Sequence, residues 1–561
     1  MQNSGKTLFV IGAGLSVCVG MCPMHGDPRI LSVHYLSIHD VGGDFRTLEG
    51  LATLLLRRIR QHQSHGPYDI LGAPFCGMLA YEVASQLVGR DEQVRFLGLI
   101  ETRCLSFGER QKTAASVPPD LEADCLVGLL RSDYVHPTAE IEKCIGPDSS
   151  ILSFDTLLER ARQCLLVPAE TSIDHAQRAI QRIQALQRAE LAYEPSPSSL
   201  CLQLLSADEE RLQLAAQSWH SLVTPARIKC QFLGGDQSLV EQGIGCYDGA
   251  VSSDVNGAAT AASSGLPESK FSSLVTIQRG GRGQTPLFCV PGAGASATDF
   301  LSLTTILDAG RPVYAFQPRG LDNDLLPHVT VEAAAQCYLR ELRRVSASGA
   351  VHLVGHSFGG WVAFEMALRL GANGRKISLT LIDCEQPATD GKLGREYTRF
   401  EALEVLVSLF EQAATKPLNV RWEHLRQLEP VGQVDYLHSC LVQCGLMPRN
   451  SCASALYGTI RTFGAALRTG YFPSGTLTVP VTLVLVPLVD EDADSAHKRF
   501  ESTARGWMQF APNIQLRRGN GNHITILRLP HVASVGDWMQ QRWAPQLGSR
   551  SLDVSSVKEN P

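Results

Sequence analysis

The chain contains the same passage twice, and this internal repeat limits the possible folds more than any other feature of the sequence. Residues 351–367 read VHLVGHSFGGWVAFEMA and residues 68–84 read YDILGAPFCGMLAYEVA, so Ser357 in the second passage corresponds to Pro74 in the first. Further pairs with nearly the same separation are Glu101 with Asp383, Trp219 with Trp507 and Gln237 with His523. A nearly constant separation, between 282 and 288 residues, indicates that a whole domain occurs twice.

The repeat and the composition together predict two domains joined by a linker. With 561 residues, 44% of them apolar and 19% charged, the chain can form two hydrophobic cores. A stretch rich in Ser, Ala and Gly lies between the copies, and such stretches are typical of flexible linkers. We therefore expect a first domain at residues 1–245, a linker at 246–271, a second domain at 272–548 and a loose tail at 549–561.

The amino-terminal residues imitate a signal peptide, because Lys6 is followed by an apolar run. The same pattern recurs at residues 287–294, deep inside the chain, so we interpret residues 8–11 as a first buried strand. Elsewhere no apolar run reaches the roughly 18 residues of a membrane-spanning helix. We therefore expect no membrane association.

Charge and cysteine content argue against further classes of function. The net charge is −6 and no block of basic residues is present, so the sequence gives no electrostatic reason to expect nucleic acid as a partner. The 16 cysteines are scattered singly, without a C-x-x-C pair. This distribution is typical of a reducing cytoplasm rather than of a disulfide framework or a zinc site.

In the second half, short apolar runs alternate with helical patterns, which predicts an α/β fold. The runs predict strands buried on both faces of a mostly parallel sheet, at residues 287–290, 313–316, 351–354, 379–382 and 481–486. Apolar residues at spacings of four and three predict a helix that begins after Thr330, its expected N-cap. From about residue 387 to 475 helical patterns replace the strand signal, which predicts a lid above the active site.

Ser357 is the candidate nucleophile. It lies between a predicted strand and a predicted helix, with Gly355 and Gly359 two residues to either side, where larger side chains would crowd a sharp turn. The start of the helix also favours developing negative charge. A serine hydroxyl further needs a base in contact with it, an acid that orients the base, and donors for the oxyanion.

Candidates for these roles lie at expected loop positions. His523, in a glycine-rich loop after the last expected strand, is the candidate base. Asp383 ends the strand after that of Ser357 and should emerge at the same sheet edge, which makes it the first candidate for the acid. The alternative acids follow the strand at 481–486 and are Asp490, Asp492 and Asp494. For the oxyanion we select the backbone N–H groups of Phe358 and of Ala293, in the loop after the first strand.

Three passages of the second half resemble a known family. Residues 313–321 read VYAFQPRGL, residues 355–367 contain the serine turn, and residues 521–523 contain the histidine. These passages closely resemble the thioesterase domains that end nonribosomal peptide synthetase and polyketide synthase lines, over most of residues 272–545. The resemblance implies two tandem α/β-hydrolase domains with a lid, and it favours Asp383 as the acid.

The resemblance also implies a function in nonribosomal peptide or polyketide biosynthesis. An acyl or peptidyl chain would arrive as a phosphopantetheine thioester on a carrier protein or synthetase module, pass to Ser357, and leave by attack of water or of an internal nucleophile. No metal and no bound cofactor are expected. The Gln-x-x-Gly-Leu passage at 317–321 favours the integrated, chain-releasing type over the editing type.

The first half resembles the same family without its chemistry. Pro74 has no hydroxyl, and its ring fixes φ near −65°, which puts the geometry of the turn itself in question. Gln237 stands at the base position, and Glu101 keeps a carboxylate at the acid position. We interpret Cys76 as a buried packing residue rather than a nucleophile. We therefore expect a pseudoenzyme that serves as a scaffold or docking surface.

Two other functions fit the same residues. An esterase or acyltransferase that acts on a free small molecule uses the same fold and triad, because neither determines the acyl donor. A non-catalytic carrier-binding protein would result if Asp383 or His523 were misplaced.

Overall fold

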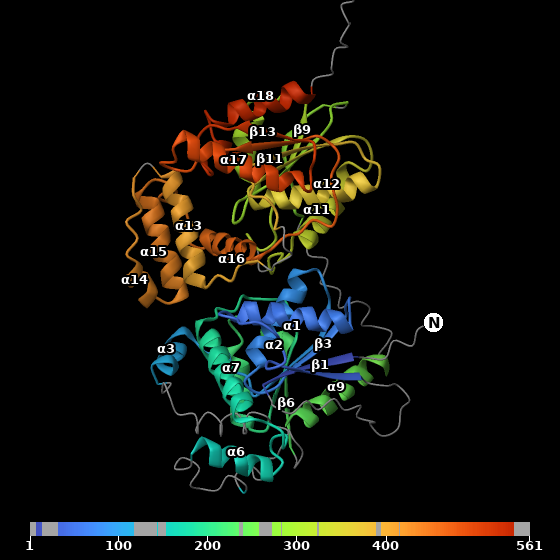
Figure 1. The fold of residues 1–561 in the computed structure, drawn as a ribbon, viewed down its shortest axis with the longest axis vertical. Coiled ribbons are helices and arrows are strands. Elements are labelled where there is room, and N and C mark those ends of the chain that lie inside the picture. The colour runs from blue at the N-terminus through green and yellow to red at the C-terminus, as the bar shows by residue number, and fades with distance from the viewer. Residues whose placement is uncertain are drawn as a thin grey trace, which may run out of the picture.

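The computed structural model describes residues 7–13, 32–116, 143, 153–234, 239–256, 272–281, 283–322, 325–388, 394–414 and 416–543. These residues form two α/β domains, one from each copy of the repeat (Figure 1). In both domains helices pack on the two faces of one central sheet, as the sequence predicted. No helix in these ranges combines the length and the apolar character that crossing a bilayer requires.

The first domain contains a six-stranded parallel sheet in the order β2-β1-β3-β4-β5-β6. Its strands are β1 (Thr7–Gly12), β2 (Ser32–Ser37), β3 (Tyr68–Gly72), β4 (Val94–Ile100), β5 (Leu202–Ser206) and β6 (Ile228–Phe232). Its helices are α1 (Leu48–His62), α2 (Gly77–Gly89), α3 (Phe107–Ser116), α6 (Phe154–Gln163), α7 (Ile173–Ala192), α8 (Glu209–Ser218), the 3₁₀ turn η2 (Pro225–Arg227) and α9 (Leu239–Asn256).

The second domain contains a seven-stranded sheet in the order β13-β12-β11-β10-β8-β9-β7, in which β7 alone is antiparallel to its neighbour. Its strands are β7 (Leu274–Arg279), β8 (Leu287–Val290), β9 (Pro312–Phe316), β10 (Val351–His356), β11 (Ile377–Ile382), β12 (Val481–Leu485) and β13 (Ile514–Arg518). Outside the insertion its helices are η3 (Ala297–Phe300), α10 (Leu301–Thr304), α11 (Val331–Val345), α12 (Phe358–Ala372), α17 (Ala493–Met508), η4 (Thr525–Leu527) and α18 (Val532–Trp543).

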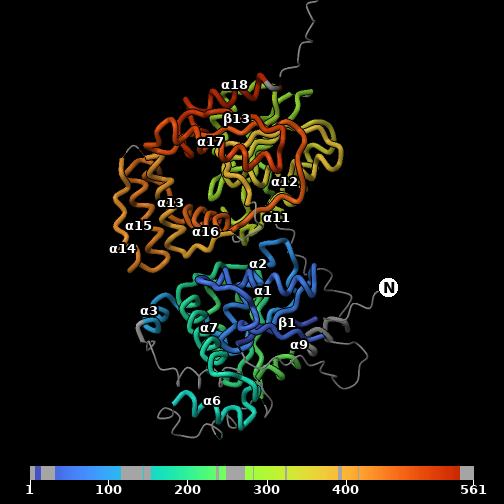
Figure 2. The backbone as a smooth tube through the Cα atoms, in the orientation of Figure 1, coloured from blue at the N-terminus to red at the C-terminus, as the bar shows by residue number. Residues whose placement is uncertain are grey.

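A helical insertion separates β11 from β12, where the sequence predicted one. Its helices are α13 (Arg399–Ala413), α14 (Trp422–Gln427), α15 (Pro430–Gln443) and α16 (Ala455–Arg468). Figure 2 shows α16 on the side of the second domain that faces α1 and α2 of the first domain. The insertion has a hydrophobic cluster of its own, which includes Leu403, Leu425 and Leu437.

The sequence predicted the central strands of the second sheet and missed both edge strands. The five apolar runs coincide with β8 to β12, whose residues are mostly buried. In β7 and β13 exposed residues are interspersed with covered ones, so neither strand forms a continuous apolar run. The predicted cap of α11 is confirmed, because the Thr330 hydroxyl accepts the Ala333 N–H at 3.2 Å.

The two sheets have the same strand order, which confirms the repeat in three dimensions. The order β2-β1-β3-β4-β5-β6 matches β9-β8-β10-β11-β12-β13, and β7 is added at the edge of the second sheet. A fully buried tryptophan occupies the same place in both domains. Trp219 Nε1–H donates to the Thr102 carbonyl at 3.2 Å, and Trp507 Nε1–H donates to the Cys384 carbonyl at 3.3 Å.

The boundary expected at residue 245 is wrong, because α9 continues to Asn256. Tyr247, inside the predicted linker, is fully buried, and its hydroxyl donates to Asp69 at 2.8 Å. Val240 is buried on the same helix, seven residues earlier. Two apolar anchors on one helical face therefore outweigh the small polar residues that suggested a linker. Residues 257–271 and the expected tail lie outside the described residues.

Asp91 joins the two domains through two ion pairs with arginines and a contact with a buried histidine. Asp91 follows α2, and three side chains of the second domain surround it, namely Arg319 at 2.6 Å, Arg340 at 3.3 Å and His328 at 3.6 Å. Arg319 is 9% exposed and also donates to the Val88 carbonyl at 3.0 Å. A cation at the C-terminal end of a helix is stabilised by the helix dipole. The end of α2 is therefore a docking point for the second domain.

Candidate active site

Ser357 occupies a strained turn between β10 and α12. Its backbone has φ 53° and ψ −127°, which non-glycine residues rarely adopt. A side chain on Gly355 would collide with the Gly359 carbonyl, so the strand can enter the turn this closely only with glycine at that position. The Ser357 N–H donates to the Ile382 carbonyl at 2.8 Å, which continues the pairing of β10 with β11. Ile382, the residue before Asp383, is therefore hydrogen-bonded to Ser357 through the backbone.

Asp383 and His523 form a hydrogen-bonded pair at the same sheet edge. His523 Nδ1 lies 2.6 Å from Asp383 Oδ2, and the two side chains are 22% and 12% exposed. Asp383 also has a left-handed backbone, with φ 44°. Its other oxygen accepts the Val486 N–H at 3.2 Å, which fixes the orientation of the carboxylate. With Nδ1–H given to the acid, Nε2 of His523 remains available as a base.

Asn522 fixes the loop that contains His523. Its side-chain oxygen accepts N–H groups of Ile524 at 3.1 Å and of Thr525 at 2.9 Å. Its amide nitrogen donates to the Gln412 carbonyl in α13 at 2.8 Å. The histidine loop is therefore tied to the helical insertion as well as to the core.

His356 is a site residue that the sequence analysis missed. It is 5% exposed, and its Nε2–H donates to the His523 carbonyl at 2.9 Å. The two imidazole rings are 4.9 Å apart. Burial, and then the neighbouring His523, lower the pKa of His356 to about 3, so it stays neutral at ordinary pH. The available signal was a histidine in the second position of G-x-S-x-G, where the first copy has Ala73.

The alternative acids lie elsewhere. Asp492 is the N-cap of α17 and accepts the N–H groups of Asp494 at 3.0 Å and of Ser495 at 2.9 Å. Hydrogen bonds from Ser495 hold the pKa of Asp492 below its ordinary value. Asp490 and Asp494 are exposed. The structure thus pairs His523 with Asp383, the first of the sequence candidates.

The two candidate oxyanion donors approach the nucleophile from different elements. Phe358 is the first residue of α12, where backbone N–H groups have no partner within the helix. Ala293 lies in the turn after β8, beside Gly292, and a Cβ on Gly292 would be 3.3 Å from Ser357 Cβ. The loop with Ala293 therefore packs directly on the serine, while its role as a donor stays a prediction. In the described residues no group of three or more His, Cys, Asp or Glu could hold a metal ion.

The corresponding turn of the first domain has a different backbone. Pro74 stands at the serine position, and the left-handed residue is Phe75, with φ 65°. α2 begins only at Gly77, two positions later than α12 in the repeat. Cys76 is buried, and burial raises the pKa of its thiol well above the ordinary value, as expected of a packing residue.

The acid position of the first domain keeps its structure. Glu101 has φ 50° and accepts the Ala207 N–H at 2.9 Å, as Asp383 accepts the Val486 N–H. It also accepts the Ser206 hydroxyl at 2.7 Å. Gln237, expected at the base position, lies outside the described residues.

A serine in a strained strand-to-helix turn and a His–Asp pair at the same edge of a mostly parallel sheet define an α/β-hydrolase. The model of the Thioesterase domain family matches residues 32–233 and residues 285–536. These ranges include most of both copies. The chain therefore belongs to the thioesterase domain family.

Several named proteins are similar to this chain. Atromentin synthetase greA of Suillus grevillei is 25% identical over 289 residues, which are 47% of this chain and 27% of that protein. Nonribosomal peptide synthetase btyA of Aspergillus terreus (strain NIH 2624 / FGSC A1156) is 29% identical over 159 residues, 28% of this chain and 17% of that protein. The chain spans less than a third of the length of these relatives.

Two solved thioesterase structures also match. The Vlm2 thioesterase domain with a bound dodecadepsipeptide is 20% identical and covers 48% of this chain and 97% of its own, with a TM-score of 0.35. The type II thioesterase YbtT of the yersiniabactin pathway is 18% identical and covers 48% of this chain and 98% of its own, with a TM-score of 0.36.

Proposed function

We propose that the second domain is a serine thioesterase that releases an acyl or peptidyl chain from a phosphopantetheinyl carrier protein. The observation that supports this most is the hydrogen bond between His523 and Asp383, at the sheet edge where Ser357 lies in its strained turn. In this proposal the chemistry needs neither a metal nor a bound cofactor, because the phosphopantetheine arrives with the substrate.

The geometry supports a two-step reaction. In the first step His523 Nε2 takes the Ser357 proton while the serine oxygen attacks the thioester carbonyl, and the thiol leaves with that proton. Asp383 orients the imidazole and stabilises its positive charge. The Phe358 and Ala293 N–H groups bind the oxyanion. In the second step water or a nucleophile of the chain itself attacks the ester, by the same use of His523, which gives hydrolysis or cyclisation.

The relatives support a carrier-bound substrate. Both curated relatives named above are synthetases, and btyA is a nonribosomal peptide synthetase by name. On this proposal the partner of this chain is a carrier protein or a synthetase module, and the insertion α13 to α16 is a lid that closes over the bound chain. The hydrogen bond from Asn522 to Gln412 in α13 supports a lid whose position is coupled to that of the histidine loop.

For the first domain we propose a non-catalytic role. Pro74 supplies no nucleophile, its turn differs from that of Ser357, and Cys76 is buried with a raised pKa. The docking of α2 on Arg319 supports a role as a scaffold for the second domain.

Turnover of one acyl group in two forms tests the proposed function. The full chain is given the group as a thioester on a carrier protein and as a soluble thioester of N-acetylcysteamine, and thiol release is measured. We expect a higher kcat/KM for the carrier-bound form, and no release by Ser357→Ala. A preference for soluble esters would favour an esterase or acyltransferase of free small molecules, and no release of any acyl group would favour a carrier-binding protein.

A further inference from the structure

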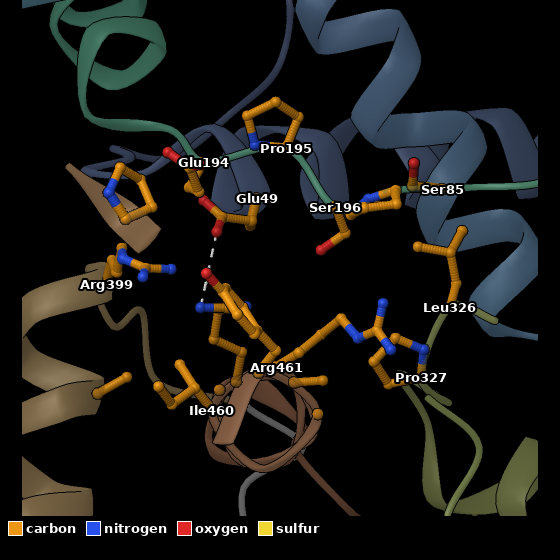
Figure 3. A pocket seen from close by; sticks show the side chains of 18 of the residues that line it. Glu49, Ser85, Glu194, Pro195, Ser196, Leu326, Pro327, Arg399, Ile460 and Arg461 are labelled. Carbon is orange, nitrogen blue, oxygen red and sulfur yellow. Dashed lines mark ion pairs between the residues drawn. The ribbon is translucent and has the colours of Figure 1, made fainter. Parts of the chain in front are cut away.

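A cavity of about 1080 Å³ lies between the two domains (Figure 3). Glu49, Glu82 and residues 193–197 line it from the first domain, and Arg399 and one side of α16 line it from the second. Figure 3 shows Glu49 and Ser196 across this space from Arg461. Pockets for small ligands usually measure about 300–1,000 Å³, so this cavity can hold a chain of several residues.

The cavity reaches the loop that packs on the candidate nucleophile. Gly294 and Ser296, directly after the Ala293 turn, belong to its lining. Gly294 has φ +67°, and a Cβ there would lie 3.0 Å from Phe463 Cβ in α16, so glycine permits the loop to meet the insertion closely. Gly292 of the same loop faces Ser357, because a Cβ added there would lie 3.3 Å from Ser357 Cβ. The cavity lining therefore begins two residues along this loop from Gly292, the position that faces Ser357.

The two copies differ at a buried glutamate that lines this cavity. In the second domain Glu365 accepts hydrogen bonds from Tyr471 at 2.9 Å and from Arg369 at 2.7 Å. In the first domain the equivalent Glu82 accepts from Tyr193 at 2.5 Å, but Gln86 stands in place of the arginine, at 2.9 Å. Glu82 is 8% exposed and has no ion pair with any described residue. The first copy has thus kept the buried carboxylate and lost the cation that neutralised it.

Among the described residues, no arginine of the cavity lining forms an ion pair with Glu82. Four arginines line it, and their partners are Glu401 for Arg46 at 2.7 Å, Gln433 for Arg399 at 3.1 Å, the Gly320 carbonyl for Arg461, and Glu49 for Arg468 at 3.6 Å. Glu194, a third acid of the first-domain wall, pairs with Arg110 at 2.5 Å. The first-domain wall therefore presents one carboxylate, Glu82, whose charge is not balanced by an ion pair.

The raised pKa of Glu82 agrees with the lack of a cation paired with it. Burial, and then the nearby Glu49, raise the pKa of Glu82 to about 7, against a partial opposing effect of its hydrogen bonds and of Arg468. A buried carboxylate without a cation is unfavourable, and a cationic ligand would reverse this penalty.

We infer that the cavity receives the chain attached to Ser357 and that Glu82 binds an ammonium group of that chain. The first copy then forms one wall of the substrate site, and the substrate is an aminoacyl or peptidyl chain with a free amine rather than an alkyl chain. This inference rests on the proposed function for the attachment to Ser357. The binding of the amine is separate from the chemistry and can be measured without it.

The test measures binding to the full-length Ser357→Ala protein by calorimetry at pH 7.5. The probes are the N-acetylcysteamine thioesters of a tripeptide with a free amino terminus, of the same tripeptide N-acetylated, and of acetate. We expect the free-amine tripeptide to bind at least about tenfold more tightly than the acetylated one, the range of one desolvated ion pair. Adding Glu82→Gln should remove this difference and leave the affinity of the acetylated tripeptide unchanged.

Two further variants test whether binding requires the cavity and whether loss of an acid outside the cavity has any effect. Ser196→Trp, which fills the cavity from a half-buried loop position, should weaken binding of both tripeptides at least about tenfold and leave the acetyl probe unchanged. Glu210→Gln, an exposed acid of α8 outside the cavity, is the matched control and should change nothing. Equal affinity for the two tripeptides, a preference that survives Glu82→Gln, or no tripeptide binding would each overturn the inference. Thioester turnover by the wild-type chain tests the proposed function independently.

Discussion

The turns after β3 and β10 occupy the same place in two sheets of the same order, yet they have different backbones. Ser357 takes φ 53° and is followed at once by α12, whereas in the first copy the left-handed residue is Phe75 and α2 begins at Gly77. A proline ring holds φ near −65°, so Pro74 cannot adopt the conformation of Ser357. The substitution therefore removes the hydroxyl and the turn together.

The acid positions show the opposite behaviour. Glu101 and Asp383 both have a left-handed backbone and accept an N–H group from the residue that directly follows the next strand of the sheet. Only Asp383 has a described histidine beside it. Hydrogen bonds at the acid position can therefore persist in a copy whose nucleophile turn has been lost.

The largest expected effect is that of Ser357→Ala. Because it removes the attacking atom, we expect kcat for thioester release to fall by about 10⁶-fold, to the detection limit. The matched change Pro74→Ala, in the first copy, should alter kcat less than twofold. Full release by Ser357→Ala, with loss of release in Pro74→Ala, would reverse the assignment of the two copies.

Replacement of the acid should have the next largest effect. Asp383→Asn keeps the size of the side chain but loses the charge that orients His523, so we expect kcat to fall by about 10⁴-fold. Glu101→Gln is the control at the equivalent position and should leave kcat unchanged. If the two variants behaved alike in steady-state kinetics, Asp383 would not be the acid.

His356→Ala makes the second turn resemble the first, where Ala73 stands. The His523 carbonyl would lose its donor, so we expect kcat to fall by about tenfold with little change in KM. Restoring a donor with His356→Gln should recover part of the loss. A large rise in KM at unchanged kcat would contradict a role in positioning His523.

His356→Ala should also change how the unfolding free energy depends on pH. The pKa of His356 is about 3 in the folded chain, below the ordinary value of about 6.5 that applies in the unfolded chain. Below pH 6.5 the unfolded state therefore binds more protons than the folded state. Stability should therefore fall as the pH falls from about 6.5, by about 2 kcal/mol at pH 5 from this residue. His356→Ala should reduce the slope of unfolding free energy against pH in that window, measured by denaturant titration. An unchanged slope would contradict a buried neutral His356.

The smallest effect on chemistry should come from the domain contact. Asp91→Asn leaves Arg319 buried beside a neutral amide, so we expect a loss of about 3 kcal/mol in unfolding free energy but less than a threefold change in kcat. Asp44→Asn, an exposed acid of the first domain, is the control. If Asp91→Asn lowered kcat as much as His356→Ala, the first copy would act on the chemistry more directly than a scaffold does.

Much of the fold could be predicted because buried parallel strands leave continuous apolar runs. The edge strands β7 and β13 left no such signal, since exposed residues interrupt both. The helix α9 left none either, since Val240 and Tyr247 anchor it among small polar residues. Asp383 could be selected from its place at the end of an expected strand, and His523 from its glycine-rich loop late in the chain. The role of His356 was missed although the histidine in G-x-S-x-G was visible, because its bond to the His523 carbonyl depends on how two distant loops meet. The cavity at Glu82 depends on how the two domains meet, and the sequence of each domain alone does not specify that contact.

Covalent labelling shows directly whether the chain has one active serine site and whether that site lies in the second copy. The full chain is treated with a fluorophosphonate, digested, and mapped by mass spectrometry. We expect a single adduct on Ser357, none on any residue of 66–90, and no adduct in Ser357→Ala. An adduct in the first copy, or an unlabelled Ser357 in the folded wild-type chain, would contradict the account.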